Sequence, residues 1–197
     1  MGRLSGRIAE ELRKGGVISE EDYPLYEYGL HEIEVTALNI VTDLLIAALM
    51  GMFLEGIVFL VIYVPLRRFA GGYHAETELR CYGLSTLLVF LALCAIRVAP
   101  GSLTLHLPLF LCASAVIFFL APVGTANKPL DTTEYCVYRR KSRSILFFHW
   151  AGAVILWLFS FRALAITIVV SDVIMGIMLV LGAIKNRVGS GQISEAQ

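Results

Sequence analysis

Long apolar segments dominate this sequence and restrict the folds that it can adopt. A helix needs about 20 mostly apolar residues to cross the hydrocarbon core of a membrane, and residues 81–99, 103–121, 144–161 and 163–184 each meet that requirement. Of the 197 residues, 57% are hydrophobic and 16% are charged, whereas a soluble domain carries about 25% charged residues. These values exclude a water-soluble globular domain, a disordered chain and a coiled coil. We expect residues 1–197 to form a single all-α integral membrane domain.

A fifth apolar region, residues 37–66, contains two glycines and a glutamate near its middle. One long tilted helix here gives five membrane crossings, whereas a hairpin that turns near residues 54–56 gives six. The positive-inside rule favours six, because only Arg97 and Arg162 then lie outside. Five crossings would also move the four basic residues of the N-terminal segment outside. We therefore predict a polytopic bundle of six transmembrane helices with both termini in the cytoplasm, although the choice between one span and a hairpin rests on this charge count alone.

Residues 1–28 form a charged segment before the first predicted span. Leu4, Ile8 and Leu12 recur every four residues among Arg and Glu side chains, which is typical of an amphipathic helix in the membrane interface. We expect this helix to lie flat on the inner membrane surface. Because no apolar stretch opens the chain, we expect no cleaved signal peptide.

Composition also argues against several classes of partner. Sixteen basic residues balance sixteen acidic ones, and the sequence contains no recognisable nucleic-acid-binding module. The four cysteines show neither a CxxC motif nor a metal-ligand spacing. We therefore expect no nucleic-acid partner, no metal, no cofactor and no disulfide framework. An ordinary interfacial position is expected for three histidines that flank spans, namely His31, His106 and His149.

Residues 67–80, between the second and third predicted spans, carry the groups best suited to chemistry. Two adjacent glycines permit a sharp, close-packed turn, and His74 precedes Cys81 by seven residues. On a continuous helix this spacing separates the two backbones by about 10 Å, so a working His–Cys pair requires His74 to fold back from the glycine turn. If the next helix begins after Thr77, then the helix dipole, Arg80 and a protonated histidine would favour the Cys81 thiolate.

Taken alone, this pattern leaves other interpretations open. A cysteine at a membrane edge is more often a small packing residue, and His74 would then be an interfacial residue with a satisfied hydrogen bond. Asp43 and Asp172 fall inside predicted spans, where ionisable residues are costly and usually face the bundle interior. They raise the alternative of a proton-coupled peptide or small-molecule transporter, although no inverted repeat is visible. A receptor or scaffold without turnover is a third class.

The string RRFAGGYHAETELRCYGLS, which lies directly before a span, resembles the accessory gene regulator protein B (AgrB) family of bacterial membrane peptidases. The shared features are a basic pair, a Gly-x-His-Ala core and a cysteine seven residues after the histidine. Chain length and span count also fit, so the resemblance covers nearly the whole chain, with the loop motif as its only specific part. Further similarity is found at Tyr28-Gly29-Leu30, at Ala121-Pro122 to Lys128-Pro129 and at Arg139-Arg140-Lys141.

The resemblance implies a thiol endopeptidase of the bacterial plasma membrane that processes the precursor of a quorum-sensing peptide, with His74 and Cys81 as its catalytic pair. In the family's scheme the thiolate attacks one peptide bond of an AgrD-like propeptide on the cytoplasmic side, and one fragment remains on the enzyme as a thioester. A cysteine or serine of that fragment then closes a thiolactone or lactone ring. Exclusion of water would favour this closure over hydrolysis. The propeptide, the ring atom and the oligomeric state, a homodimer included, are left open by the sequence.

Several further residues are candidates for binding or positioning the substrate. The basic cluster in the predicted cytoplasmic loop 122–143 flanks a span, as topogenic charge does, and it could also attract an acidic stretch of precursor or anionic lipid. No third residue that orients His74 is identifiable, and Glu76 also suits the first turn of a helix. The candidates for substrate binding and positioning are Arg67, Arg68, Gly71, Gly72, Glu78, Asp131, Arg139 and Arg140.

Overall fold

The computed structural model describes residues 3–75, 77–124 and 130–194. Glu76 lies outside these residues, as do residues 125–129 of the Ala121-Pro122 to Lys128-Pro129 segment, so the expectations for them stay predictions. Within the described residues the chain forms seven helices, which confirms the all-α prediction. The helices are α1 (Arg3–Lys14), α2 (Tyr23–Leu49), α3 (Phe53–Ala70), α4 (Glu78–Val98), α5 (Leu103–Leu120), α6 (Thr132–Leu158) and α7 (Arg162–Ser194).

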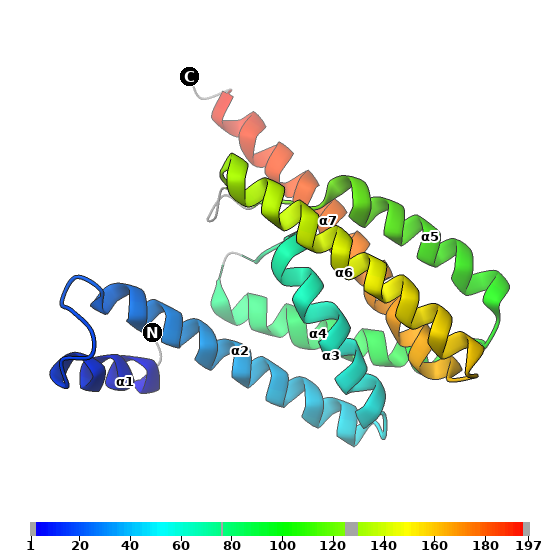
Figure 1. Ribbon diagram of the computed structural model, residues 1–197, viewed down its shortest axis with the longest axis horizontal. Helices are drawn as coiled ribbons and strands as arrows, with labels where there is room; N and C mark the ends of the chain where they lie inside the picture. The colour runs from blue at the N-terminus through cyan, green and yellow to red at the C-terminus, as the bar shows by residue number, and fades with distance from the viewer. Residues whose placement is uncertain (1–2, 76, 125–129, 195–197) are drawn as a thin grey trace.

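The helices form a bundle with a projecting N-terminal arm. Figure 1 shows α3 to α7 gathered together, while α1 and the first half of α2 extend away from them. Helix α7 is the central element, since it packs against α3, α4, α5 and α6. Its middle section is also the most buried of the apolar helices. Two fully buried residues of α7, Met175 and Leu179, contribute to the core that also contains Leu66 of α3 and Ile117 of α5.

The apolar region 37–66 folds as a hairpin and not as one long helix. Helix α2 ends at Leu49, a turn at residues 50–52 includes Gly51 with a φ of 67°, and α3 begins at Phe53. The two helices then approach each other closely, because Gly56 packs directly against the side chain of Ala47. The hairpin interpretation is confirmed, with the turn a few residues earlier than predicted.

The predicted count of six membrane-spanning helices is wrong for the described residues. Only three helices, α4, α5 and the 162–187 part of α7, are long and apolar enough to cross a membrane. Every predicted span does correspond to a helix, but α2, α3 and α6 continue beyond their apolar parts into charged sequence. For example, α3 includes Glu55, Arg67 and Arg68, and α6 begins with a basic half. The sequence analysis counted apolar cores and left the charged turns of the same helices outside.

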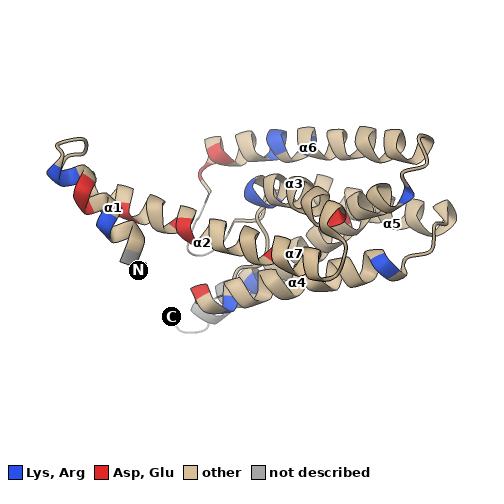
Figure 2. Ribbon diagram, turned by 90° about the horizontal axis from the view of Figure 1, so that it is seen from below, with Lys and Arg blue, Asp and Glu red and all other residues tan. Residues whose placement is uncertain are grey.

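Charge is distributed unevenly along the bundle. Figure 2 shows both termini at one end of the molecule, and the basic residues of α3 and α6 lie toward that same end. Arg97 is in the last turn of α4 and Arg162 is the first residue of α7, and Figures 1 and 2 show these two helix ends at the other end of the bundle. This is the division on which the positive-inside argument depends.

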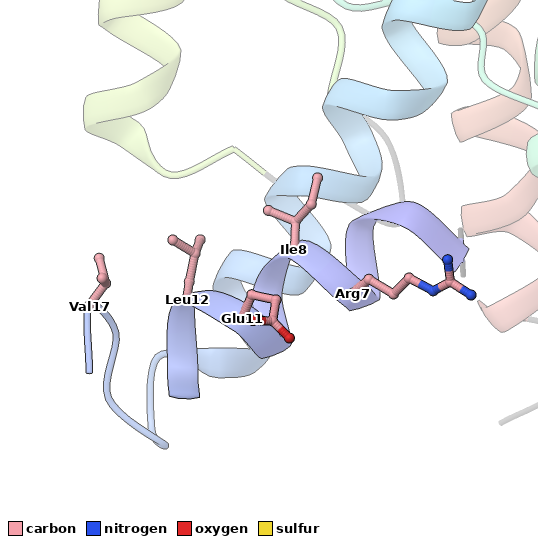
Figure 3. Close-up of a pocket in the computed structure, with 5 residues that line it drawn as sticks. All are labelled: Arg7, Ile8, Glu11, Leu12 and Val17. Carbon is pink, nitrogen blue, oxygen red and sulfur yellow. The ribbon is translucent and has the colours of Figure 1, made fainter. Parts of the chain in front are cut away.

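Helix α1 is amphipathic, as predicted, and packs against α2. Its Ala9 is fully buried, and the backbone N–H of Ser5 donates to a carboxylate oxygen of Glu34 at 3.2 Å. An exposed apolar strip on α1 borders a shallow hollow of about 300 Å³ (Figure 3). The expected position flat on the membrane stays a prediction. The hollow is lined by Arg7, Ile8, Glu11, Leu12 and Val17.

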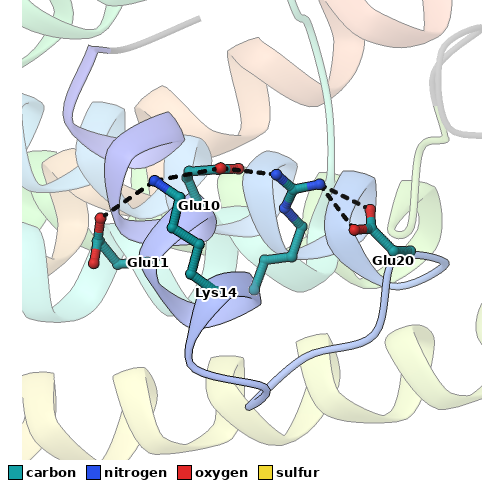
Figure 4. A network of polar contacts seen from close by, with 5 residues as sticks. Glu10, Glu11, Lys14 and Glu20 are labelled. Carbon is teal, nitrogen blue, oxygen red and sulfur yellow. Dashed lines mark hydrogen bonds and ion pairs between the residues drawn. The ribbon is translucent and has the colours of Figure 1, made fainter.

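Ion pairs connect charged residues on the polar face of α1 with the turn that follows it. Arg13 bridges Glu10 of its own helix, at 2.7 Å, and Glu20 of the following turn, at 2.9 Å, while Lys14 lies near Glu10 and Glu11 (Figure 4). The helix ends before Gly15, and Gly16 has a φ of 68°. The network is exposed, so it fixes the shape of the turn more than it adds stability.

Candidate functional site

The segment between α3 and α4 leads Cys81 into the first turn of a helix. Thr77 caps α4, since its hydroxyl accepts a hydrogen bond from the N–H of Arg80 at 3.4 Å. The N–H of Cys81 donates to the carbonyl of Thr77 at 2.9 Å. The predicted cap is confirmed, and the half-buried Cys81 lies at the positive end of the helix dipole.

Gly71 and Gly72 bring the backbone of this loop against two other segments. Gly71 forms an isolated parallel bridge with Val123, and the N–H of Gly72 donates to the Val123 carbonyl at 3.3 Å. Their φ angles are 72° and 113°, in the region that favours glycine. A Cβ at Gly71 would overlap the Val123 carbonyl, and a Cβ at Gly72 would lie 2.9 Å from the carbonyl oxygen of Met178. Both positions therefore require glycine for space as well as for conformation.

Arg67 and Arg68 are adjacent in sequence but have different surroundings. The guanidinium of Arg67 donates to the carbonyls of Gly71 and Tyr73, so it clamps the loop from the end of α3. Arg68 is exposed, and its guanidinium lies 6.0 Å from the centroid of the Phe69 ring. Arg67 therefore shapes the loop, whereas Arg68 stays available at the surface.

Helix α7 supplies a platform for the loop that the sequence analysis missed. The N–H of Tyr73 donates to the carbonyl of Met178 at 2.8 Å, and Lys185 Nζ donates to the carbonyl of His74 at 3.0 Å. Gly182 lies between these contacts, and a Cβ there would be 2.6 Å from the carbonyl carbon of Gly72. A glycine within an otherwise apolar span was the one available indication of close packing here.

The same end of α7 also holds the segment after α5. Asn186 Nδ2 donates to the carbonyl of Gly124 at 2.7 Å, and the N–H of Val123 donates to the carbonyl of Ala70 at 2.9 Å. Hydrogen bonds therefore join three segments, namely the loop that contains Gly71 and Gly72 (the glycine loop), residues 121–124 and the end of α7.

Arg67 is the group that links the two predicted catalytic residues electrostatically. Its charge interacts with both Cys81 and His74, while no hydrogen bond joins His74 to Cys81 among the described residues. The pKa of His74 lies below its ordinary value, first because of partial burial and then because of the positive charges of Arg67 and Lys185. The neutral imidazole is thus favoured, and the protonated His74 suggested from the sequence is not. Arg67 replaces it as the cation near Cys81.

Glu78 and Asp131 lie in the structure at helix ends. The carboxylate of Glu78 contacts His31 Nε2 through both oxygens at 3.1 Å, which joins the start of α4 to α2. Asp131 caps α6 and accepts a hydrogen bond from the N–H of Glu134 at 2.6 Å within a capping box. These contacts give both carboxylates structural partners, and neither is brought to His74.

The basic start of α6 approaches the end of α3 through Phe69. The rings of Phe69 and Tyr138 form a T-shaped pair with centroids 5.7 Å apart, and Lys141 Nζ lies 4.7 Å from the Phe69 centroid. Arg139 lies over the ring of Tyr135, one turn earlier on the same helix, and Arg140 is exposed. The cluster therefore borders the end of α3, with Arg140 directed to the surface.

A buried polar pair joins α6 to α7 inside the bundle. His149 Nδ1 lies 2.8 Å from an Asp172 carboxylate oxygen, and both side chains are almost fully buried. The interfacial position predicted for His149 is wrong, and His31 and His106 are likewise buried. Helical proximity between residues 23 apart in sequence cannot be inferred from either residue alone. Asp43 is also buried, and its Oδ1 has no partner among the described residues.

Comparison with known proteins identifies relatives over most of the chain. Residues 5–182 match the family model Accessory gene regulator B. A putative AgrB-like protein of Clostridium perfringens strain SM101 is 26% identical over 142 residues, which are 66% of this chain and 64% of that protein. A putative AgrB-like protein of Listeria monocytogenes strain EGD-e is 29% identical over 134 residues, 67% of this chain and 66% of that protein.

Protein FsrB of Enterococcus faecalis is 29% identical over 107 residues, which are 53% of this chain and 44% of that protein. The chain thus spans about two thirds of the length of the first relatives and less than half of FsrB. No solved structure matches this chain. The family match extends from α1 into the part of α7 that supports the glycine loop, and the chain belongs to the accessory gene regulator B family.

Proposed function

We propose that this protein is a membrane-embedded cysteine endopeptidase that cleaves a quorum-sensing propeptide and promotes its cyclisation. The observation that carries the proposal is the position of Cys81 in the first turn of α4, within reach of the Arg67 charge that also acts on His74. Family membership supplies the class of substrate, an AgrD-like propeptide.

Cleavage begins with a proton transfer for which the environment of His74 is suited. Its pKa is lowered by partial burial and by two cations, so the imidazole is free to accept the thiol proton of Cys81. The thiolate forms at the N-terminal end of α4, where the charge of Arg67 also acts. In the substrate complex the imidazole moves to within hydrogen-bond reach of the thiol, since such contacts are often long in unliganded enzymes.

The thiolate then attacks the carbonyl carbon of one peptide bond of the propeptide. A carbon–sulfur bond forms, the carbon–nitrogen bond breaks, and the imidazolium of His74 returns its proton to the departing amine. The N-terminal fragment remains attached to Cys81 as a thioester, and the C-terminal tail leaves.

Ring closure uses the activated acyl group. A thiol or hydroxyl within the bound fragment attacks the thioester carbonyl and gives up its proton to His74, while the Cys81 thiolate leaves. The products are a thiolactone or lactone and free enzyme. Ring closure competes with hydrolysis of the thioester, so we expect the bound propeptide to exclude water from this end of the bundle.

The exposed basic residues suit an acidic part of the propeptide. Arg68 and Arg140 lie at the surface near the end of α3 and the start of α6, where they can attract carboxylates without forming the loop themselves. Arg139 extends the same charge along α6. We further propose that this end of the bundle, with both termini, faces the cytoplasm of a bacterial cell, as the distribution of basic residues favours (Figure 2).

Substitution of the two reacting residues tests the proposal. An AgrD-like propeptide with a C-terminal epitope tag is co-expressed with each variant, and tail release is followed by immunoblotting. We expect Cys81→Ala and Cys81→Ser to abolish cleavage without loss of membrane insertion, and His74→Ala to do the same. Cys136→Ala, which removes an exposed cysteine of α6, is the matched control and should cleave normally. Tail release by Cys81→Ala at the wild-type rate would disprove the catalytic assignment.

A further inference from the structure

We infer that Lys185 of α7 is a positioning residue of this site, which fixes the backbone carbonyl of His74 and the ring of Tyr73 against the bundle. The inference rests on the proposed function, because it assigns Lys185 a role in the reaction of His74. It gives α7, which already supports the loop through Met178 and Gly182, a direct contact with the residue that carries the imidazole.

The contact between Lys185 and the loop is direct and specific. Its Nζ donates to the carbonyl of His74 at 3.0 Å and lies 5.1 Å from the centroid of the Tyr73 ring. A lysine after an apolar helix also serves as a flanking positive charge, but that role requires only a position near the interface. A hydrogen bond to the backbone of the proposed catalytic histidine is an additional, local constraint.

Three positions on one face of α7 act together on the loop. Met178, Gly182 and Lys185 are separated by four and three residues, so they lie along a single stripe of the helix. Met178 accepts a hydrogen bond from Tyr73, Gly182 permits the close approach of the backbone, and Lys185 binds the next carbonyl. Lys185 is therefore the last contact of a continuous docking face.

Arg67 and Lys185 hold successive carbonyls from opposite sides. Arg67 donates to Gly71 and Tyr73 from α3, and Lys185 donates to His74 from α7. Helix α4 also packs against α7. Helix α7 therefore positions both the backbone of His74 and the helix that carries Cys81. Without the Lys185 contact, the loop would be held on α7 by the Tyr73–Met178 hydrogen bond, one residue before His74.

The positive charge of Lys185 also affects the pKa of His74. The charged groups that act on His74 are Arg67 from α3 and Lys185 from α7, while Glu78 of α4 is turned to His31. Both cations disfavour the imidazolium and hold the pKa of His74 below its usual range, after the larger effect of partial burial. Removal of the Lys185 charge therefore raises the pKa of His74, and a larger share of the protein is protonated in mildly acidic solution.

The test compares Lys185→Met and Lys185→Arg with wild type in inverted membrane vesicles. Initial rates of cleavage of the tagged AgrD-like propeptide are measured from about pH 5 to pH 8, at low and at saturating concentration. For Lys185→Met we expect kcat to fall about tenfold, the size of one lost charge-assisted hydrogen bond, with little change in KM. The acidic limb of the pH profile should move to higher pH. Lys185→Arg should restore both properties.

Three controls separate the possible failures. Lys14→Met removes a lysine whose ion pairs are with Glu10 and Glu11 of α1, and it should leave rate and pH profile unchanged. Thermal unfolding in detergent checks that each variant is folded. Cys81→Ala is assayed in parallel, because activity in that variant would refute the proposed function and not the role of Lys185.

Two results would overturn the inference. The first is a Lys185→Met variant with the wild-type rate and pH profile while Cys81→Ala is inactive. The second is a uniform loss of rate at every pH that Lys185→Arg does not restore, which would show a contribution to folding alone.

Discussion

Two short connections in this molecule contain a glycine with a positive φ, yet they are held in different ways. The turn between α2 and α3 has Gly51 at a φ of 67°, and nothing lies within 4 Å of the place where its Cβ would be. The connection between α3 and α4 has Gly71 and Gly72, whose Cβ atoms would collide with the backbones of Val123 and Met178. The first turn needs glycine only for its own conformation, whereas the second is shaped by contacts with distant segments.

This difference separates a local turn from a positioned one. The turn at residues 50–52 could be moved or replaced with a local cost, since its hydrogen bonds are to α2 itself. The glycine loop is bound by Arg67, residues 121–124 and α7 together. Changes at any of these three should displace His74 and lower cleavage.

The largest effect is expected for Gly72→Ala. The new methyl would lie 2.9 Å from the carbonyl oxygen of Met178, at a φ of 113° that alanine rarely adopts. The loop must then leave α7, and misplacement by about 1 Å can lower a rate about 100-fold. Tail release from the tagged propeptide should fall by about this factor or more. Wild-type activity in this variant would show that the close approach to Met178 is unnecessary.

Gly182→Ala should have the next largest effect, a fall in tail release of about 30-fold, because the new methyl on α7 pushes the loop away from that helix. Alanine favours a helix over glycine by about 1 kcal/mol, so α7 itself gains stability. The methyl would, however, lie 2.6 Å from the carbonyl carbon of Gly72. Cleavage assays and thermal unfolding should therefore move in opposite directions. A parallel decline of both would indicate damage to α7 and not to the loop.

Arg67→Lys should lower cleavage about tenfold, the effect of one lost hydrogen bond to a charged donor. Lysine keeps the positive charge near Cys81, but it cannot reproduce the planar fork that binds the carbonyls of Gly71 and Tyr73. Arg68→Lys is the matched control, since Arg68 is exposed, and it should have a smaller effect. Equal losses in the two variants would contradict the distinct surroundings of the two arginines.

Gly51→Ala should have the smallest effect on activity. Strain in the left-handed region should lower the free energy of unfolding by about 1 kcal/mol, measured by thermal or denaturant unfolding in detergent. Cleavage should stay within about twofold of wild type, as is usual for a change away from the site. A strong loss of cleavage would mean that the α2–α3 turn also controls the loop, and the comparison would fail.

The features that the sequence predicted are those set by neighbouring residues. The Thr77 cap follows from capping preferences, and the amphipathic character of α1 follows from the spacing of Leu4, Ile8 and Leu12. The family motif located the glycine loop in the same way. These properties depend on a few adjacent side chains, so one sequence suffices.

The features that it missed depend on packing between distant segments. Nothing in the sequence around Lys185 indicates that its ammonium meets the carbonyl of His74, 111 residues away. The pairing of His149 with Asp172 likewise requires the register of α6 against α7. The number of spans was overestimated because helix length and apolar length differ in α2, α3 and α6. The roles of the candidate site residues remain predictions.

The His149–Asp172 contact has a consequence for how the chain enters the bilayer. A lone carboxylate at the centre of a translocating helix costs about 3 kcal/mol at the translocon, and Asp172 lies in the most apolar of the helices. Its partner is carried by the preceding helix, and only a three-residue connection, residues 159–161, separates α6 from α7. Biogenesis is therefore favoured when these two helices insert together as a paired unit. Helix α7, which carries the docking face for the glycine loop, would then enter the lipid with α6 already beside it.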